Sequence, residues 1–174
     1  MTAENLASLK KRLLEILKKD AYFQERIVLS SGKESNFYID ARLVTLTSEG
    51  AFLTASIILE LIKDQKIDAI GGPTLGADPI VGALAVLSHL NQKPLNTFIV
   101  RKAPKPHGRM RNIEGPALKE GAKVILIDDV ATTGKSLLEA IEKLRQDKVE
   151  VLMAIVLVDR QEGAAENLAK LDCP

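Results

Sequence analysis

Apolar residues at the start of the chain recur with the spacing of a helix. Most intervals between them are three or four residues, and lysines fill several positions between them; the stripe consists of Leu6, Leu9, Leu13, Ile16 and Leu17. This pattern predicts one amphipathic helix whose apolar face packs against the rest of the protein. A helix lying on a membrane surface or on a partner would show the same stripe, and that alternative stays open here.

Beyond this helix the apolar positions change their period. A turn is expected at Ser31–Gly32, then a short aromatic strand over 36–40 and a buried helix over 50–63. From residue 67 onward, short apolar runs alternate with helical stretches, and a short helix is expected over 164–174. The predicted strands are 67–70, 97–100, 123–127 and 149–158, and the helices between them are 78–90 and 136–144.

This alternation of strands and helices predicts an α/β protein. Right-handed βαβ connections build a largely parallel sheet flanked by helices, and the nearly all-apolar run 149–158 suits a strand covered on both faces. Ligands of such sheets bind at the carboxyl ends of the strands. The loops 71–78, 101–116, 128–136 and 159–163 are therefore expected to face one crevice.

Composition narrows the class of protein. The chain has 174 residues, 46% hydrophobic and 27% charged, which suits one folded domain and argues against global disorder. Its formal net charge of +1 lacks the basic excess of a general nucleic-acid binder. The single cysteine, Cys173, cannot form an internal disulfide, and no apolar run reaches the ~18–20 residues of a membrane span. We therefore expect a cytoplasmic, single-domain protein that binds neither nucleic acid nor membrane.

A candidate phosphate site follows the strand 123–127. Two carboxylates, Asp128 and Asp129, come directly after this apolar strand, and a Thr-Thr-Gly turn then opens a helix. The free N–H groups at a helix start bind phosphate, and Gly134 lets a ligand approach the backbone closely. Three hydroxyl groups add further donors, those of Thr132, Thr133 and Ser136.

The acidic pair decides which phosphate ligand fits. The run Gly134–Lys135–Ser136 ends like a Walker A motif, but that motif requires glycine where Asp129 stands. A carboxylate accepts hydrogen bonds and a cis-diol donates two, so Asp128 and Asp129 suit ribose hydroxyls. The pattern therefore indicates a ribose 5-phosphate site. The alternative is a structural strand-to-helix turn whose hydroxyls cap the helix and whose acids favour its dipole.

Residues 101–111 form a basic segment without one acidic residue. Pro104, Pro106 and Gly108 exclude a regular helix or a central strand, so the segment is predicted to be a loop. A solvated basic loop or a weak nucleic-acid patch would have the same composition. Beside a sugar-phosphate site, its cations would neutralise a departing diphosphate and its histidine would donate a proton. The positively charged residues are Arg101, Lys102, Lys105, Arg109 and Arg111, and His107 lies among them.

Two of these segments resemble a known family. Residues 127–134 resemble the phosphoribosyl diphosphate (PRPP) signature of type I phosphoribosyltransferases, and residues 101–108, with Ile113–Gly115 after them, resemble the catalytic loop of the orotate phosphoribosyltransferases. The resemblance implies a type I phosphoribosyltransferase fold with a small N-terminal hood (1–45) and an α/β core (46–174). It also implies a homodimer in which the loop of one subunit covers the active site of the other.

The resemblance assigns roles to individual residues. Lys102, Lys105 and His107 would be catalytic and, with Arg101, would bind PRPP. The remaining PRPP contacts would be Thr74, Leu75 and Gly76 through backbone amides, together with Asp128, Asp129, Val130, Ala131, Thr132, Thr133, Gly134, Lys135 and Ser136. Many relatives carry glycine in place of Lys135, and some carry lysine in place of Gly76.

The base site is implied by the same resemblance. Residues 29–40 resemble the segment that lies against the pyrimidine ring, so Tyr38 and Ile39 would form its wall. Arg160 would hold the orotate carboxylate, with Thr132 nearby, because arginine pairs with carboxylates through two parallel hydrogen bonds. Taken without the resemblance, Tyr38 is better explained as a core residue, and Arg160 is as readily a surface residue that closes a strand.

The implied reaction transfers the ribose 5-phosphate group of PRPP to orotate. The products would be orotidine 5′-phosphate and diphosphate, in de novo pyrimidine (UMP) biosynthesis. Mg²⁺ is the expected cofactor, held mainly by PRPP oxygens rather than by a dedicated protein cage. The alternatives are transfer to another base and a non-catalytic PRPP or nucleotide sensor of the same fold, which would have little use for Lys102, Lys105 and His107.

Overall fold

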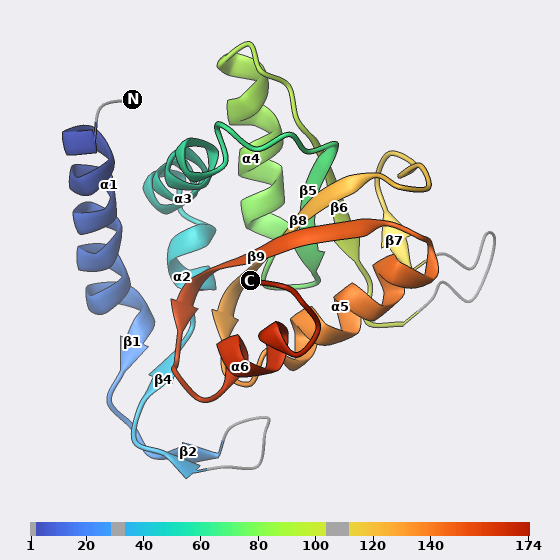
Figure 1. The fold of residues 1–174 in the computed structure, drawn as a ribbon. Helices are drawn as coiled ribbons and strands as arrows, with labels where there is room; N and C mark the ends of the chain where they lie inside the picture. The colour runs from blue at the N-terminus through green and yellow to red at the C-terminus, as the bar shows by residue number, and fades with distance from the viewer. Residues whose placement is uncertain (1–2, 29–33, 104–111) are drawn as a thin grey trace.

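The computed structural model describes residues 3–28, 34–103 and 112–174 (Figure 1). The chain begins with α1 (Ala3–Ile16), which continues as the π-helical turn η1 (Leu17–Ala21). Leu13 and Ile16 of the predicted stripe are buried against Leu53 and Ile57 of α3 (Ser48–Leu61). The N-terminal helix is therefore a packing helix.

The centre of the fold is a five-stranded sheet. Its strands are β5 (Ala69–Pro73), β6 (Asn96–Val100), β7 (Ile113–Glu114), β8 (Lys123–Ala131) and β9 (Glu150–Asp159), in the order β7-β6-β5-β8-β9. All neighbours are parallel except β7, which runs antiparallel to β6 at one edge. The predicted α/β class with a mostly parallel sheet is confirmed, whereas β7, inside the expected loop 101–116, was not predicted.

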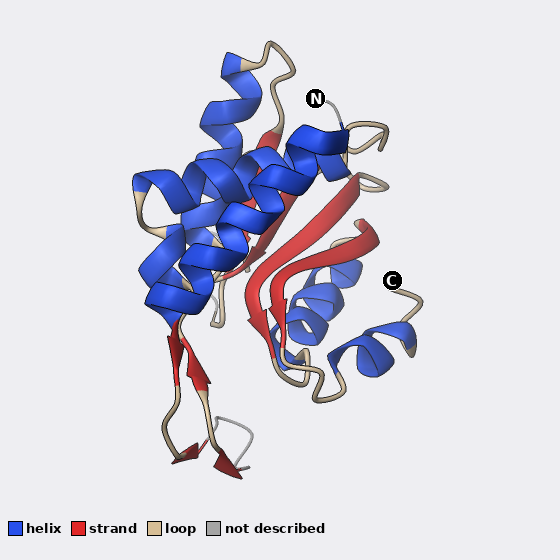
Figure 2. Cartoon of the chain, turned by 90° about the vertical axis from the view of Figure 1, so that its left-hand side faces the viewer, coloured by secondary structure: helices blue, strands red, loops and turns tan. Residues whose placement is uncertain are grey.

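Helices cover both faces of this sheet (Figure 2). The alternation along β8 explains why its sequence is apolar throughout: Ile125 and Ile127 pack toward α3 and α4 (Asp78–Leu90), while Val124 and Leu126 pack toward α5 (Lys135–Gln146). The last helix, α6 (Ala164–Ala169), lies on the α5 side. Within the described ranges, no helix has the length and apolar character needed to cross a membrane.

Two strands run further than their apolar residues predict. β5 continues through Gly71 and Gly72 to Pro73, and β8 continues through both aspartates to Ala131. The extra residues are paired, for example Asp128 with Val156 on β9. Glycine is required in β5 because a Cβ at Gly72 would overlap the carbonyl oxygen of Ile127. The prediction that the acidic pair stands in the loop 128–136 is therefore wrong, because sheet pairing continues past the apolar run.

The last strand, β9, lies at one edge of the sheet. Even so, both of its faces are packed: Ala154 and Val156 face the α5 side, and Met153, Ile155 and Leu157 face the α3 and α4 side. Its central residues are half-buried because the outer edge of the strand has no neighbouring strand among the described residues. Coverage on both faces is thus confirmed for a strand that is not central.

Residues 22–28 and 34–40, which we call the arm, extend away from the sheet (Figures 1 and 2). The arm contains β1 (Tyr22–Phe23), β2 (Ile27–Val28), β3 (Glu34–Ser35) and β4 (Tyr38–Ile39), paired β1 with β4 and β2 with β3. The strand predicted over 36–40 is thus only two residues long. The short helix α2 (Arg42–Thr45) returns the chain to the core.

Candidate active site

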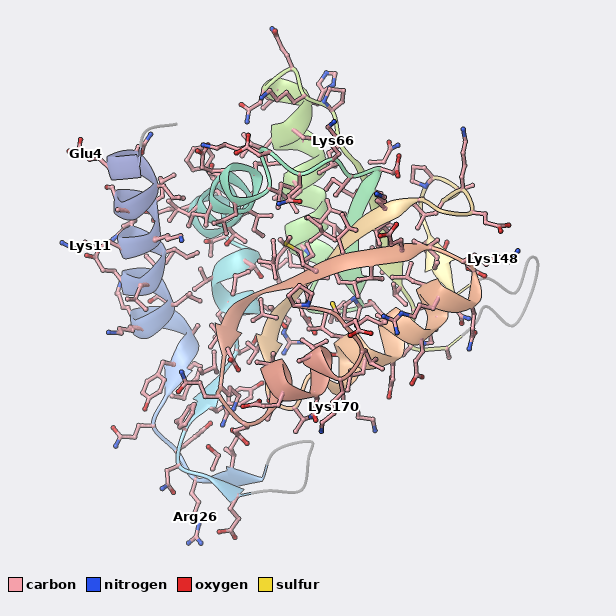
Figure 3. The ribbon with its side chains drawn as sticks, in the orientation of Figure 1. Glu4, Lys11, Arg26, Lys66, Lys148 and Lys170 are labelled. Atoms are coloured by element: carbon pink, nitrogen blue, oxygen red, sulfur yellow. The ribbon has the colours of Figure 1, made fainter. Side chains whose placement is uncertain are left out.

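A cavity of about 460 Å³ lies at the carboxyl ends of β5, β8 and β9. Each of the four loops predicted to share one crevice supplies a part of its lining, and the arm and α2 supply the rest. In contrast, the charged side chains labelled in Figure 3, such as Lys11 and Lys148, point outward from the fold. The lining residues are Ile27, Tyr38, Ile39, Asp40, Arg42, Pro73, Thr74, Leu75, Gly76, Lys102, Asp128, Asp129, Val130, Thr132, Ser136 and Arg160.

The acidic pair is held by its own backbone and by α5. Asp128 is only 5% exposed, and its Oδ2 accepts a hydrogen bond from the Ser136 hydroxyl at 2.7 Å. Its Oδ1 accepts from the backbone N–H of Asp129 at 3.0 Å. Burial raises the pKa of Asp128 to about 7; the neighbouring Asp129 charge adds to this rise, and the Ser136 hydrogen bond opposes it. The site therefore presents one carboxylate that titrates near neutrality beside a second one.

The turn between β8 and α5 has the geometry of an anion site. Gly134 precedes the helix with φ of 75°, a left-handed conformation that favours glycine. The N–H groups of the first turn of α5 have no acceptor within the helix, so they are available to a phosphate. Thr132, Val130 and Ser136 line the cavity.

Three predicted residues of this segment do not line the cavity with their side chains. Ala131 is buried, Thr133 accepts a hydrogen bond at its carbonyl from the Asn167 side chain at 3.0 Å, and Lys135 is exposed and lies 3.9 Å from Glu139.

The turn between β5 and α4 approaches the acidic pair closely. Thr74 donates its hydroxyl to Asp78 Oδ2 at 2.9 Å, which holds the turn against the start of α4. A Cβ at Gly76 would overlap the Asp129 carboxylate, so a side chain at that position would require the Asp129 side chain to move. Glycine in place of the lysine of some relatives thus matches the packing of this chain, and the turn offers backbone groups alone at Gly76.

Arg160 joins the end of β9 to the arm. Its side chain is 2% exposed, and its Nη2 donates to Ser35 Oγ at 2.9 Å while its Nε donates to Glu162 Oε1 at 2.9 Å. The guanidinium also lies 4.2 Å from the centroid of the Phe37 ring. Sequence reasoning placed Arg160 at the base site but missed the contacts with the arm, because they join residues more than 120 positions apart.

The basic segment enters the cavity through Lys102. Arg101, also predicted to bind PRPP, does not line the cavity; its guanidinium lies 3.3 Å from Glu114 Oε1 and donates to the carbonyl of Ala103 at 3.2 Å. Lys143 of α5 donates to the carbonyl oxygens of Arg101 and Lys102 at 2.7 and 3.0 Å. The predicted residues Lys105 and His107 lie outside the described residues. Lys143 was missed because its sequence position is that of an ordinary helix-surface lysine.

A second pair missed by the sequence analysis lies on the cavity wall at the start of α2. Arg42 donates from Nε and Nη2 to the two carboxylate oxygens of Asp40, at 2.8 and 3.0 Å. These hydrogen bonds lower the pKa of Asp40. The only signal in the sequence was an aspartate and an arginine two residues apart, directly after the aromatic segment.

The donor set suits a hard cation only in part. Asp128 and Asp129 offer oxygen ligands of the kind that Mg²⁺ prefers. Across residues 3–28, 34–103 and 112–174, no group of three or more His, Cys, Asp or Glu side chains could hold a metal ion. A Mg²⁺ ion in this cavity would therefore take most of its ligands from a bound substrate.

The fold and this site define a phosphoribosyltransferase. The family model of the phosphoribosyl transferase domain matches residues 45–172. The chain is 45% identical over 161 residues to an orotate phosphoribosyltransferase of Synechocystis sp., covering 92% of this chain and 81% of that protein. It is 42% identical to an orotate phosphoribosyltransferase of Aquifex aeolicus, covering 98% and 91%.

A solved structure agrees with these relatives. The orotate phosphoribosyltransferase of Mycobacterium tuberculosis H37Rv, in complex with 5-phospho-α-D-ribosyl 1-diphosphate, superposes with a TM-score of 0.77 at 32% identity, over 95% of this chain and 91% of that one. The chain therefore belongs to the orotate phosphoribosyltransferase family.

Proposed function

We propose that this protein transfers the ribose 5-phosphate group of PRPP to orotate, forming orotidine 5′-phosphate and diphosphate in pyrimidine biosynthesis. The observation that carries the proposal is the composition of one cavity. It contains the start of α5, which can bind an anion, and an acidic pair suited to a diol. It also contains the Thr74–Gly76 turn, which we call the glycine turn, and the Tyr38 ring beside the buried Arg160.

The cavity has a place for each part of PRPP. The 5-phosphate takes the N–H groups at the start of α5, and the ribose hydroxyls donate to Asp128 and Asp129. The diphosphate takes the backbone of the Thr74–Gly76 turn and the Lys102 ammonium. A ring nitrogen of orotate then bonds to C1 of the ribose as the bond between C1 and the diphosphate oxygen breaks. The protein holds the reactants in line and stabilises the negative charge on the leaving group.

Orotate lies against Tyr38 and Ile39 in this proposal, with Thr132 nearby and its carboxylate on Arg160. The Arg160 guanidinium has five N–H donors, and its present partners are neutral groups of the arm and Glu162. The orotate carboxylate therefore shares this guanidinium with Glu162, and Ser35 and Phe37 continue to hold it in place.

Mg²⁺ is the cofactor expected in this proposal. Asp128 and Asp129 would help to hold it beside the substrate, where it would neutralise charge on the diphosphate. Lys102, Lys105 and His107 neutralise the leaving diphosphate, and His107 donates a proton to it. We also propose a homodimer in which the basic segment of one subunit covers the active site of the other.

Two further parts of the proposal concern the whole chain. The boundary between an N-terminal hood (1–45) and an α/β core (46–174) is supported by the family match, which begins at residue 45. The expectation that the enzyme acts in the cytoplasm is supported by its single cysteine, which suits a reducing compartment.

The test is a turnover assay with the purified protein, PRPP, Mg²⁺ and a panel of pyrimidine and purine bases. Among the bases, we expect turnover only with orotate. The amount of orotate lost, measured by its absorbance, should equal the amount of diphosphate released. Turnover with another base instead would make the protein a phosphoribosyltransferase of different specificity. No turnover with any base would refute the enzyme proposal.

A further inference from the structure

Three described cations line the cavity, and two of them, Arg160 and Lys102, already have a role in the proposed function. Arg160 is 2% exposed and already holds Glu162 and the arm. Lys102 belongs to the basic segment and is exposed. Arg42, in contrast, stands on the first residue of α2, and its side chain is 38% exposed.

Asp40 positions the Arg42 guanidinium but uses only some of its N–H donors. The two hydrogen bonds from Nε and Nη2 grip both oxygens of Asp40, and the Arg42 backbone N–H donates to Asp40 Oδ1 at 3.1 Å. A guanidinium has five N–H donors, so three remain after these two bonds. Among the hydrogen bonds of the described residues, none of those three donors has an acceptor. An arginine held in this way is prepared for an anion with several oxygens.

The position of α2 indicates which anion this is. α2 packs against α4, the helix that follows the Thr74–Gly76 turn. The hydrogen bond to Asp40 is the main cause of the raised pKa of Arg42, and the Asp129 charge adds to this rise, so the guanidinium lies within electrostatic range of Asp129. Since residue 76 is glycine and brings no cationic side chain to this turn, positive charge on this side of the cavity has to come from another element.

Resting on the proposed function, we infer that Arg42, oriented by Asp40, binds the diphosphate group of PRPP. Its role is to supply the fixed positive charge that the glycine turn lacks, whereas Lys102 supplies charge from the basic segment. The competing hypothesis is that the Asp40–Arg42 pair only joins the arm to the core, and that hypothesis predicts no change in ligand affinity as long as the fold persists.

The experiment compares Arg42→Ala with the control Arg12→Ala. Arg12 makes a similar double hydrogen bond to Glu49, at 2.6 and 3.0 Å, but lies on α1 and does not line the cavity. The probe is inorganic diphosphate with Mg²⁺, measured by calorimetry without other substrates, followed by KM values for PRPP and orotate. We expect Arg42→Ala to weaken diphosphate binding and raise the PRPP KM by about tenfold or more, with the orotate KM changed less than about threefold. Arg12→Ala should leave all three values within about twofold.

Unchanged diphosphate affinity in a folded Arg42→Ala protein would overturn the inference, as would a loss confined to orotate. If this variant does not fold, Arg42→Lys and Arg42→Gln replace it; lysine should retain more diphosphate affinity than glutamine, and equal affinities would overturn the inference. Wild-type turnover with orotate tests the proposed function separately, so an inactive wild type that still binds diphosphate through Arg42 would refute the reaction and keep the inference.

Discussion

The two sides of the cavity are built in different ways. The side formed by β8 is a continuation of a core strand. Ile125, Leu126 and Ile127 are completely buried, and Asp128 follows them in the same strand. The side formed by the arm consists of two-residue strands, and Tyr22 and Phe23 are 45% and 40% exposed. Arg160 binds this arm to the end of β9.

This difference separates the chemistry that must stay fixed from the chemistry that varies with the base. The groups that we propose for phosphate and ribose are positioned by a strand that cannot move without disturbing the core. The groups that we propose for the base are positioned by local pairing and by one arginine, so their position depends on few contacts. We expect substitutions on the β8 side to change stability and substitutions on the arm to change substrate affinity.

The largest effect is expected from truncation in the core strand. Leu126→Ala leaves a cavity between β8 and α5 and should lower the free energy of unfolding by about 2–5 kcal/mol in denaturant titrations. Phe23→Ala in the arm removes a ring stacked 6.3 Å from Tyr38 and should cost less than about 1.5 kcal/mol. Equal losses in the two variants would contradict the contrast between the two sides of the cavity.

The next effect concerns pH and belongs to the β8 side. Because the pKa of Asp128 is about 7 in the folded protein and 3.8 ordinarily, the folded state binds its proton more tightly than the unfolded state. The contribution of Asp128 to the free energy of unfolding is therefore complete below about pH 4. It falls by up to about 4 kcal/mol as the pH rises through 7. Asp128→Asn should flatten this part of the stability profile; an identical slope in wild type and variant would show that the group does not titrate there.

On the arm side, Arg160→Ala should reduce orotate turnover by about a hundredfold while PRPP affinity changes less than about threefold. Steady-state kinetics in both substrates measure this difference. Ser35→Ala is the matched control, because it removes one contact with the arm and keeps the guanidinium. If Ser35→Ala were as damaging as Arg160→Ala, the arginine would act by holding the arm and not by binding the carboxylate.

The smallest effect is expected at the base of the basic segment. Lys143→Met removes the two hydrogen bonds to the carbonyl oxygens of Arg101 and Lys102, so kcat/KM for PRPP should fall by about threefold to tenfold. Lys148→Met is the control, since Lys148 points outward and pairs with Glu120 (Figure 3). Lys143→Arg should keep most of the wild-type kcat/KM, because a guanidinium can donate to the same carbonyls. No difference between the two Met variants would show that Lys143 only stabilises α5.

Several parts of the fold and site followed from local patterns. The period of the apolar residues predicted the helices and the parallel strands, and the position of loops after strands predicted which segments meet. That prediction brought Thr74, Asp128, Thr132 and Arg160 to one cavity, as the structure has them. The ends of β5 and β8 were missed, because backbone pairing holds polar and glycine residues in a strand without any apolar signal.

Local sequence patterns were enough to specify the type of chemistry at this site: an apolar strand that ends in two carboxylates, a helix start with hydroxyls, a glycine turn and a basic segment. The packing of the folded chain was needed to set how these groups are oriented and held. Ser35 accepts a hydrogen bond from Arg160, the Asp129 carboxylate packs against Gly76, and Lys143 donates to the Lys102 carbonyl; each contact joins elements distant in the chain. The physical reason is that local periodicity records which residues are buried, whereas a side chain's partners depend on how the buried elements pack.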